Sequence, residues 1–266
     1  MLGPRIVASS TQTKFPEGTR VALTEGGGYG TLRNGTWQEY MVAQAKHLTI
    51  IPEHVSDEDA AALTTGAGYS TPYLALKELA KFTPGQRVLA PGISGSIGLG
   101  TMQVARALGA AQVISTASST AKAEQGRALG YEIIDLSQET LQEGVTRVTN
   151  GAGVNAVLDG VAGPITGQAL ACLAPSGTLV NIGYSGGMEA TIKVTDLIWR
   201  TAHMVGFMFS LFSQETILET NRILFDLLAQ GRLKPLVGRI FPLEETAKAQ
   251  QFLIEGHSFG RVLLRL

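Results

Sequence analysis

The chain has 266 residues, 44% of them hydrophobic, which is enough to build one large domain or two ordinary domains with sizeable cores. Its formal net charge of −1 excludes a strongly basic surface, so we expect a small-molecule substrate and no nucleic acid partner. The single cysteine, Cys172, excludes an intrachain disulfide and a cysteine-rich zinc site, and the four histidines form no short-spaced ligand pair, so we expect no metal.

The first fifty residues have the pattern of short strands separated by turns. The runs "RIVAS", "TRVALT" and "EYMVA" are apolar, and segments containing glycine or proline stand between them. The beginning, "MLGPRIVASS", lacks the basic start and long apolar centre of a signal peptide, and no apolar run is long enough to span a bilayer. We therefore expect an all-β section in a cytoplasmic protein that does not enter a membrane.

Helical patterns begin near Ser56, because the residues from Ser56 to Asp59 resemble a capping box. A second helix start is expected at Ser70 and Thr71, which precede Pro72. Strand patterns then alternate with helix patterns, the strands being "RVLAPG", "AQVISTA", "YEIIDL", "NAVLDGV" and "GTLVNIG". Parallel neighbours need a crossover connection, so this alternation predicts five parallel strands with helices between them.

The last part of the sequence begins with the apolar segment "DLIWRTAHMVGFMFSLF", which we interpret as a buried strand with a helix on one side. An amphipathic helix is predicted next by the spacing of Ile217, Ile223, Leu224, Leu227 and Leu228. The runs "VGRIFPL" and "RVLLRL", with a short helix between them, complete the chain.

A run of glycines, "PGISGSIGLG", directly follows the first strand of the alternating region and opens a helix. Gly92, Gly95 and Gly98 stand where a dinucleotide-binding unit needs a tight turn, close approach of a pyrophosphate and close packing of helix on strand. The first N–H groups and the positive end of that helix would then bind the phosphates. Ile93 occupies the place of the first glycine in the common pattern, and a glycine turn that packs without any ligand is the alternative.

The residues after the second strand of such a unit select the cofactor, since an acid there binds the ribose of NAD. Here the strand is followed by Ser118 and Ser119, and then by Lys122, without an acid. Hydroxyl and ammonium groups bind a 2′-phosphate through charge-assisted hydrogen bonds, so NADP is the expected cofactor. The alternative is that the serines only cap the next helix and that Lys122 is an ordinary surface residue.

Six blocks carry a family resemblance that runs in order from about Gly35 to the end. They are "RNGTWQEYMVAQAKHLTIIPEHVSDEDAAAL", "TPGQRVLAPGISGSIGLGTMQVARALGA", "STASSTAKAEQGRALGYEIIDL", "VNAVLDGVAG", "LAPSGTLVNIG" and "GHSFGRVLL". Together they resemble the zinc-independent quinone oxidoreductases, zeta-crystallin-like proteins of the medium-chain dehydrogenase/reductase superfamily. The resemblance implies an α/β fold with a Rossmann doubly wound parallel sheet at residues 71–205, a partial GroES-like β lobe at residues 1–70, and a return to that lobe at residues 206–266. It also implies NADPH in the cleft between the lobes and a homodimer formed by pairing of Rossmann sheets.

The same resemblance implies a cofactor site along the ends of several strands. The pyrophosphate would meet Ser94, Gly95, Ser96, Ile97 and Gly98, and the 2′-phosphate would meet Ser118, Ser119 and Lys122. Further cofactor contacts are implied for Val161, Ala162, Gly183, Tyr184, Ser185, Phe207, Met208, Phe209, Gly260 and Arg261. Alternatively, Gly183 only ends a strand, and the aromatic residues at 207 and 209 only belong to the core.

The implied reaction is hydride transfer from NADPH to a quinone or an α,β-unsaturated carbonyl compound. The carbonyl oxygen needs a hydrogen-bond donor, for which Ser70 and Thr71 are the candidates. Tyr69 and Tyr40 are further candidates, each with a buried aromatic role as the alternative. A second hypothesis is a nucleotide-binding protein, such as a sensor or a crystallin-like relative, that no longer turns over a substrate.

Three departures from the family pattern stand out. The chain starts inside the first lobe of the relatives, so we expect part of the substrate pocket of that lobe to be absent. Leu136 stands where relatives often carry a tyrosine that contacts the adenine side, and Pro72 adds one residue before the helix that follows Ser70 and Thr71.

Overall fold

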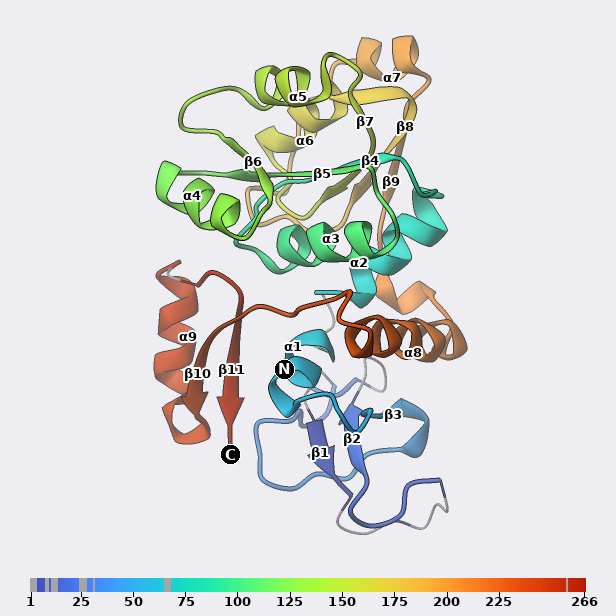
Figure 1. The fold of residues 1–266 in the computed structure, drawn as a ribbon, viewed down its shortest axis with the longest axis vertical. Helices are drawn as coiled ribbons and strands as arrows, with labels where there is room; N and C mark the ends of the chain where they lie inside the picture. The colour runs from blue at the N-terminus through green and yellow to red at the C-terminus, as the bar shows by residue number, and fades with distance from the viewer. Residues whose placement is uncertain are drawn as a thin grey trace. The chain divides into compact units, whose positions relative to one another are not determined.

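The computed structural model describes residues 4–7, 10, 14–23, 28–30, 32–64, 68–256 and 258–266 (Figure 1). Ala8, Ser9 and Thr24, at the ends of two expected strands, lie outside the described residues. The chain divides into two compact units, one formed by residues 1–70 with 210–266 and the other by residues 71–209. Phe207, Met208 and Phe209 therefore lie in the second unit.

In the first unit, β1 (Pro4–Ile6), β2 (Arg20–Leu23) and β3 (Leu48–Ile50) form an antiparallel sheet with β2 in the centre. The expected strand "EYMVA", residues 39–43, is wrong, since this segment has no regular secondary structure. Tyr40 and Val42 are 78% and 94% exposed, so the segment lacks the buried face on which a strand pattern depends.

The helices of the first unit follow their sequence patterns. α1 (Asp57–Thr64) starts at the predicted cap, where the Asp59 N–H donates to the Ser56 Oγ at 3.1 Å. α8 (Gln214–Ala229) buries apolar residues of one face, including Ile217 and Leu224. The parallel pair of β10 (Val237–Pro242) and β11 (Arg261–Arg265) is joined through η4 (Leu243–Glu245) and α9 (Thr246–Ile254). The first unit also contains the 3-10 helix η1 (Ala45–His47), and a further 3-10 helix, η3 (Phe209–Leu211), crosses the boundary between the two units.

A short helical connection precedes the second sheet. It consists of α2 (Ser70–Leu74) and a π-helical turn, η2 (Ala75–Leu79), in which the Ala80 N–H donates to the Ala75 carbonyl at 2.8 Å. A π turn contains more residues than an α turn, so it can accommodate an extra residue in this connection, such as the one expected at Pro72.

The second unit contains a six-stranded parallel sheet in the order β6-β5-β4-β7-β8-β9. Its strands in chain order are β4 (Arg87–Ala90), β5 (Gln112–Ala117), β6 (Glu132–Asp135), β7 (Val154–Asp159), β8 (Leu173–Asn181) and β9 (His203–Gly206). Five of them match the five predicted parallel strands, and β9 lies in the apolar segment for which a further strand was expected. The order reverses between β4 and β7, which is the arrangement of a doubly wound Rossmann sheet.

Helices cover both faces of this sheet. α3 (Ser96–Ala107) and α4 (Thr120–Ala128) lie on one face, and α5 (Leu141–Thr149) and α6 (Pro164–Leu170) lie on the other (Figure 1). The predicted α/β fold class is therefore confirmed. Within this arrangement, the carboxyl ends of the strands and the loops that follow them share one edge of the sheet.

The core of the second unit consists of strand residues enclosed on both faces. Leu89, Ile114, Val157 and Leu179, from four neighbouring strands, are fully buried and belong to one cluster. Helix α5 approaches β6 closely, because a Cβ on Gly144 would lie 2.5 Å from the Ile134 Cγ2. Burial on both faces explains why these strands are continuous apolar runs in the sequence.

The segment "DLIWRTAHMVGFMFSLF" differs from its prediction in burial. It forms α7 (Val194–Arg200) and β9, but Ile198, Trp199 and Met204 are 65%, 77% and 37% exposed. The physical reason is position, since β9 is the last strand of the sheet and pairs only with β8. The expectation of a buried strand was therefore wrong.

Among the described residues, no helix is long and apolar enough to cross a membrane, and no group of three or more His, Cys, Asp or Glu residues is arranged to hold a metal ion.

We predict that Leu89→Ala destabilises the second unit by about 2–5 kcal/mol, because it opens a cavity in a close-packed core. Leu89 is 0% exposed, whereas Leu129, after α4, is 44% exposed and provides the matched control Leu129→Ala. The measurement is chemical denaturation of both variants. Equal losses of unfolding free energy would contradict the assignment of Leu89 to the core.

Candidate functional site

The glycine turn is fixed to the neighbouring strand by its backbone. Gly92, just beyond β4, has a φ of +81°, which favours glycine. Its N–H donates to the Thr116 Oγ1 at 2.9 Å, and the Ile93 N–H donates to the Thr116 carbonyl at 2.8 Å. Thr116, in β5, thus holds the turn at the carboxyl end of the sheet, a role that sequence analysis did not identify.

The other two glycines allow the first turn of α3 to rest on the Gly92 carbonyl. A Cβ on Gly98 would lie 2.0 Å from the Gly92 oxygen, and a Cβ on Gly95 would lie 3.3 Å from it. The first distance is far inside a normal contact, so a side chain at position 98 would displace the helix from the turn. The glycines therefore have a packing role whether or not a ligand binds.

The amino end of α3 is suited to an anion. Gly95 is the N-cap residue and provides no side-chain acceptor for the first-turn N–H groups. Gly95 and Ser96 are exposed, Ser94 is half-buried, and the absence of a side chain at Gly95 permits close approach to the backbone. Because the helix macrodipole is positive at this end, the residues present fit a diphosphate group.

A buried acid shapes the loop after β7. Asp159 is 0% exposed, and its Oδ1 accepts hydrogen bonds from the N–H groups of Val161 and Ala162 at 2.9 and 2.8 Å. Its Oδ2 accepts from the Thr166 hydroxyl at 2.6 Å. Ala162 has a φ of +60°, an unfavourable conformation for alanine that these bonds help to hold. Asp159 was not singled out from sequence, although it ends the predicted strand "NAVLDGV".

The loop after β8 lies against the loop after β7. The Gly183 N–H donates to the Asp159 carbonyl at 3.2 Å, and a Cβ on Gly183 would lie 2.6 Å from the Gly160 oxygen. The Ser185 hydroxyl donates to that same oxygen at 3.3 Å. Gly183 thus does more than end a strand, because it permits close contact of the two loops. The structure brings together the candidate residues Val161, Ala162, Gly183, Tyr184 and Ser185.

The residues after β9 continue the same edge of the sheet. The Phe207 N–H donates to the Asn181 carbonyl at 2.8 Å, at the end of β8. The rings of Phe207 and Phe209 are 6.3 Å apart, and both residues are half-buried, while Met208 is 60% exposed. None of the three is a fully buried core residue, so the core alternative does not describe them.

Around the start of α4, the serines and Lys122 have distinct environments. The Ser119 Oγ caps α4 by accepting from the Lys122 N–H at 3.5 Å, as the capping alternative anticipated, while Ser118 is exposed. In the part of the chain that the structure describes, the half-buried Lys122 forms no ion pair. Capping by Ser119 leaves the exposed Ser118 hydroxyl and the Lys122 ammonium as groups for an anion.

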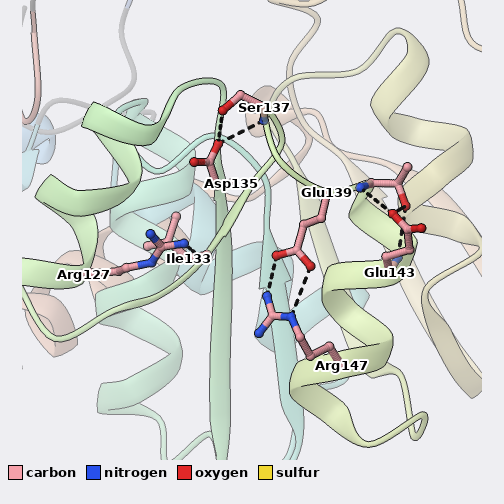
Figure 2. Close-up of polar contacts among 8 residues, drawn as sticks. Arg127, Ile133, Asp135, Ser137, Glu139, Glu143 and Arg147 are labelled. Atoms are coloured by element: carbon pink, nitrogen blue, oxygen red, sulfur yellow. Dashed lines mark hydrogen bonds and ion pairs between the residues drawn. The ribbon is translucent and has the colours of Figure 1, made fainter.

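A second acid, Asp135, lies beside the same loop and was missed in the sequence. It ends β6 with 3% of its surface exposed, and its carboxylate accepts from the Ser137 N–H and the Ser137 hydroxyl at 3.0 and 2.6 Å (Figure 2). It also accepts from the Thr120 hydroxyl at 2.7 Å. The hydrogen bonds from Ser137 and Thr120 hold the pKa of the Asp135 carboxyl below its ordinary value. The one feature of the sequence that could have identified Asp135 is its position at the end of the third predicted strand of the unit.

Other candidate residues lie in or near the first unit. The Ser70 hydroxyl donates to the Asn221 Oδ1 at 3.1 Å, and Tyr69, Ser70 and Thr71 are all buried. The side chain of Arg261 lies over Gly68, since a Cβ there would be 1.6 Å from the Arg261 Nη2. Gly260 has a φ of +99°. Tyr40 is 78% exposed, so the buried aromatic role that was its alternative is wrong.

The cysteine has no catalytic environment. Burial raises the pKa of the Cys172 thiol to about 12, which keeps it protonated at neutral pH and makes it a poor nucleophile.

Comparison with known proteins gives consistent matches. A model of the zinc-binding dehydrogenase family matches residues 96–225. Quinone oxidoreductase-like protein 2 of Bos taurus is 33% identical over 232 residues, which cover 86% of this chain and 66% of that protein. The chain thus spans just under two thirds of the length of this relative.

Two further matches cover more of the other protein. Quinone oxidoreductase of Pseudomonas aeruginosa is 30% identical over 261 residues, covering 96% of this chain and 77% of that protein. The solved structure of mycobacterial Rv1454c complexed with NADPH is 28% identical and superposes with a TM-score of 0.82, covering 99% of this chain and 81% of that one.

We predict that Gly98→Ala destabilises the second unit by about 2 kcal/mol or more, because the new methyl group clashes with the Gly92 carbonyl. Gly206→Ala is the control, since a Cβ there meets nothing within 4 Å. Thermal and chemical denaturation of the two variants check the prediction. A Gly98→Ala protein as stable as the control would show that the turn is not close-packed.

We also predict that Asp159→Ala costs about 3 kcal/mol or more in unfolding free energy, because two N–H groups and a hydroxyl lose their acceptor inside the protein. Glu124→Ala, at an exposed acid of α4, is the control. Amide hydrogen exchange should additionally show faster exchange at Val161 and Ala162 in the Asp159 variant alone. Unchanged protection of these amides would contradict the role of the carboxylate.

Proposed function

The chain belongs to the quinone oxidoreductase family of the medium-chain dehydrogenase/reductase superfamily, and from this premise we propose that it is an NADPH-dependent reductase of quinones or α,β-unsaturated carbonyl compounds. The observation that carries the proposal is the exposed amino end of α3, whose N-cap residue Gly95 has no side chain; the packing of Gly98 on the Gly92 carbonyl holds this end in place. This contact leaves an uncapped helix end exposed at the carboxyl edge of a Rossmann sheet, where a diphosphate binds.

The preference for NADPH rests on the loop after β5. The proposed contacts of the 2′-phosphate are the exposed Ser118 hydroxyl and the Lys122 ammonium, with Ser119 holding the amino end of α4 in place. A related structure, that of mycobacterial Rv1454c, was solved with NADPH, which supports this cofactor.

The nicotinamide end of the cofactor is proposed to lie along the loops after β7, β8 and β9. Asp159 fixes the backbone of Val161, and Gly183 brings the next loop against Gly160, so these loops offer a preorganised surface. Phe207 and Phe209 provide apolar area that excludes water. When bound, the nicotinamide supplies the hydride, and the protein contributes orientation and a dry environment.

The proposed hydrogen-bond donor to the substrate carbonyl is Ser70 or Thr71, with Tyr69 as a further candidate. Because the Ser70 hydroxyl donates to Asn221, it must exchange this partner before it can donate to a substrate oxygen. We also propose a homodimer that pairs β9 with its copy, since β9 is the last strand of its sheet and is largely exposed.

The test of function is consumption of NADPH, followed by its absorbance, with phenanthrenequinone, benzoquinone and short enones as acceptors. Turnover of at least one acceptor is expected. NADPH binding without consumption of any acceptor would instead support the second hypothesis, a nucleotide-binding protein without catalysis.

The proposed phosphate site predicts that Lys122→Glu weakens NADPH binding about tenfold or more, because an attractive charge becomes a repulsive one. Affinity for NADH, which lacks the 2′-phosphate, should change much less. Lys193→Glu, which makes the same charge change at an exposed residue before α7, is the control. Titration followed by fluorescence or heat measures the affinities, and an unchanged NADPH affinity in Lys122→Glu would overturn the assigned site.

A further inference from the structure

We propose that Asp135 is a specificity-determining residue that weakens the preference of the site for NADPH, so that the protein also binds NADH. The inference rests on the proposed function, since it concerns the adenosine end of the same dinucleotide site. The residues directly after β5, where an acid binds the ribose of NAD, are Ser118 and Ser119. The structure brings an acid to that place from the neighbouring strand.

The register of the sheet determines this placement. Ala117, the last residue of β5, pairs with Asp135, the last residue of β6, and the Leu136 N–H donates to the Ala117 carbonyl at 2.9 Å. The Asp135 Oδ2 accepts from the hydroxyl of Thr120, which follows Ser119 directly. The carboxylate thus lies against the loop that carries the proposed contacts of the 2′-phosphate.

Among the residues that the structure describes, Asp135 forms no ion pair. Its hydrogen-bond donors are the hydroxyls of Ser137 and Thr120 and the Ser137 N–H, all of which are neutral. Of the two guanidinium groups beside this loop, Arg147 binds Glu139, and Arg127 donates to the Ile133 carbonyl (Figure 2). The charge of Arg127 also lowers the pKa of the Asp135 carboxyl, but as the smallest of the several causes. The low pKa of the Asp135 carboxyl keeps its negative charge present at neutral pH.

Two effects on a bound dinucleotide follow. A 2′-phosphate carries nearly two negative charges and is repelled by the carboxylate, whereas the ribose hydroxyl of NADH is not. In addition, Asp135 accepts a hydrogen bond from the Thr120 hydroxyl. While this bond is present, the exposed Thr120 cannot donate the same hydrogen to a phosphate. Lys122 favours NADPH and Asp135 opposes it, which reduces the discrimination between the two cofactors.

The decisive quantity is the ratio of the dissociation constants for NADH and NADPH, measured with the 266-residue chain. Because both are measured on one preparation, the ratio does not depend on the fraction of active protein. Asp135→Asn should raise the ratio, in favour of NADPH, by about fivefold to tenfold, because it removes the repulsion while keeping the shape of the side chain. A ratio within about twofold of the original protein, in folded material, would overturn the proposal.

Two further variants separate charge from loop structure. Glu139→Gln removes a neighbouring carboxylate that is turned toward Arg147 on α5, and it should leave the ratio unchanged (Figure 2). Ser137→Ala removes a donor to Asp135 but retains the charge, and it should also leave the ratio unchanged. A shift in either variant as large as that in Asp135→Asn would overturn the proposal, because the specific charge would not be its cause.

The original protein gives a result even if Asp135→Asn fails to fold. Comparable affinities for the two cofactors, within about a factor of ten, support the proposal, and a preference for NADPH of about a thousandfold or more overturns it. Failure of the proposed function is distinguishable from both results. Binding of neither cofactor would overturn the proposed function and the inference together, whereas binding without turnover would overturn the reductase activity alone.

Discussion

The contact between Gly98 and the carbonyl oxygen of Gly92 determines how the rest of the second unit can be used. A Cβ on Gly98 would lie only 2.0 Å from that oxygen, so it is the glycine at this position that allows α3 to begin directly against the turn. Thr116 then holds the turn on β5 through two hydrogen bonds from Gly92 and Ile93. As a result, the exposed amino end of α3 is fixed at the edge where strand β4 ends, and the neighbouring loops are arranged around it.

Two buried acids, Asp159 and Asp135, organise the loops on either side of this centre. Both end a parallel strand, and both accept hydrogen bonds from N–H and hydroxyl groups. Such donors satisfy a buried carboxylate without cancelling its charge. Asp159 orders the backbone on the nicotinamide side of the proposed site, whereas Asp135 adds a negative charge on the adenosine side. The two carboxylates thus have similar hydrogen-bond donors, but one positions a loop and the other is proposed to repel a phosphate.

The features that could be predicted from the sequence are those with local causes. The glycine turn follows from residues within one strand, turn and helix, and five strands of the sheet follow from apolar runs that are buried on both faces. The missed features depend on distant partners. The Ser70 hydroxyl bonds to Asn221 and the Thr120 hydroxyl to Asp135, and neither pairing is visible in a local pattern. The exposure of Met204 and Tyr40 was also missed, because an apolar run does not reveal whether another element covers it.

The π turn at Ala75–Leu79 allows the connection into the Rossmann sheet to contain one more residue than a regular α-helix would. An additional residue in an ordinary α-helix would rotate every later side chain by about 100°, which would carry through to the start of β4. Widening one turn instead confines the rotation to a few residues. The wider turn therefore lets this connection hold an extra residue without altering the strand that leads into the glycine turn.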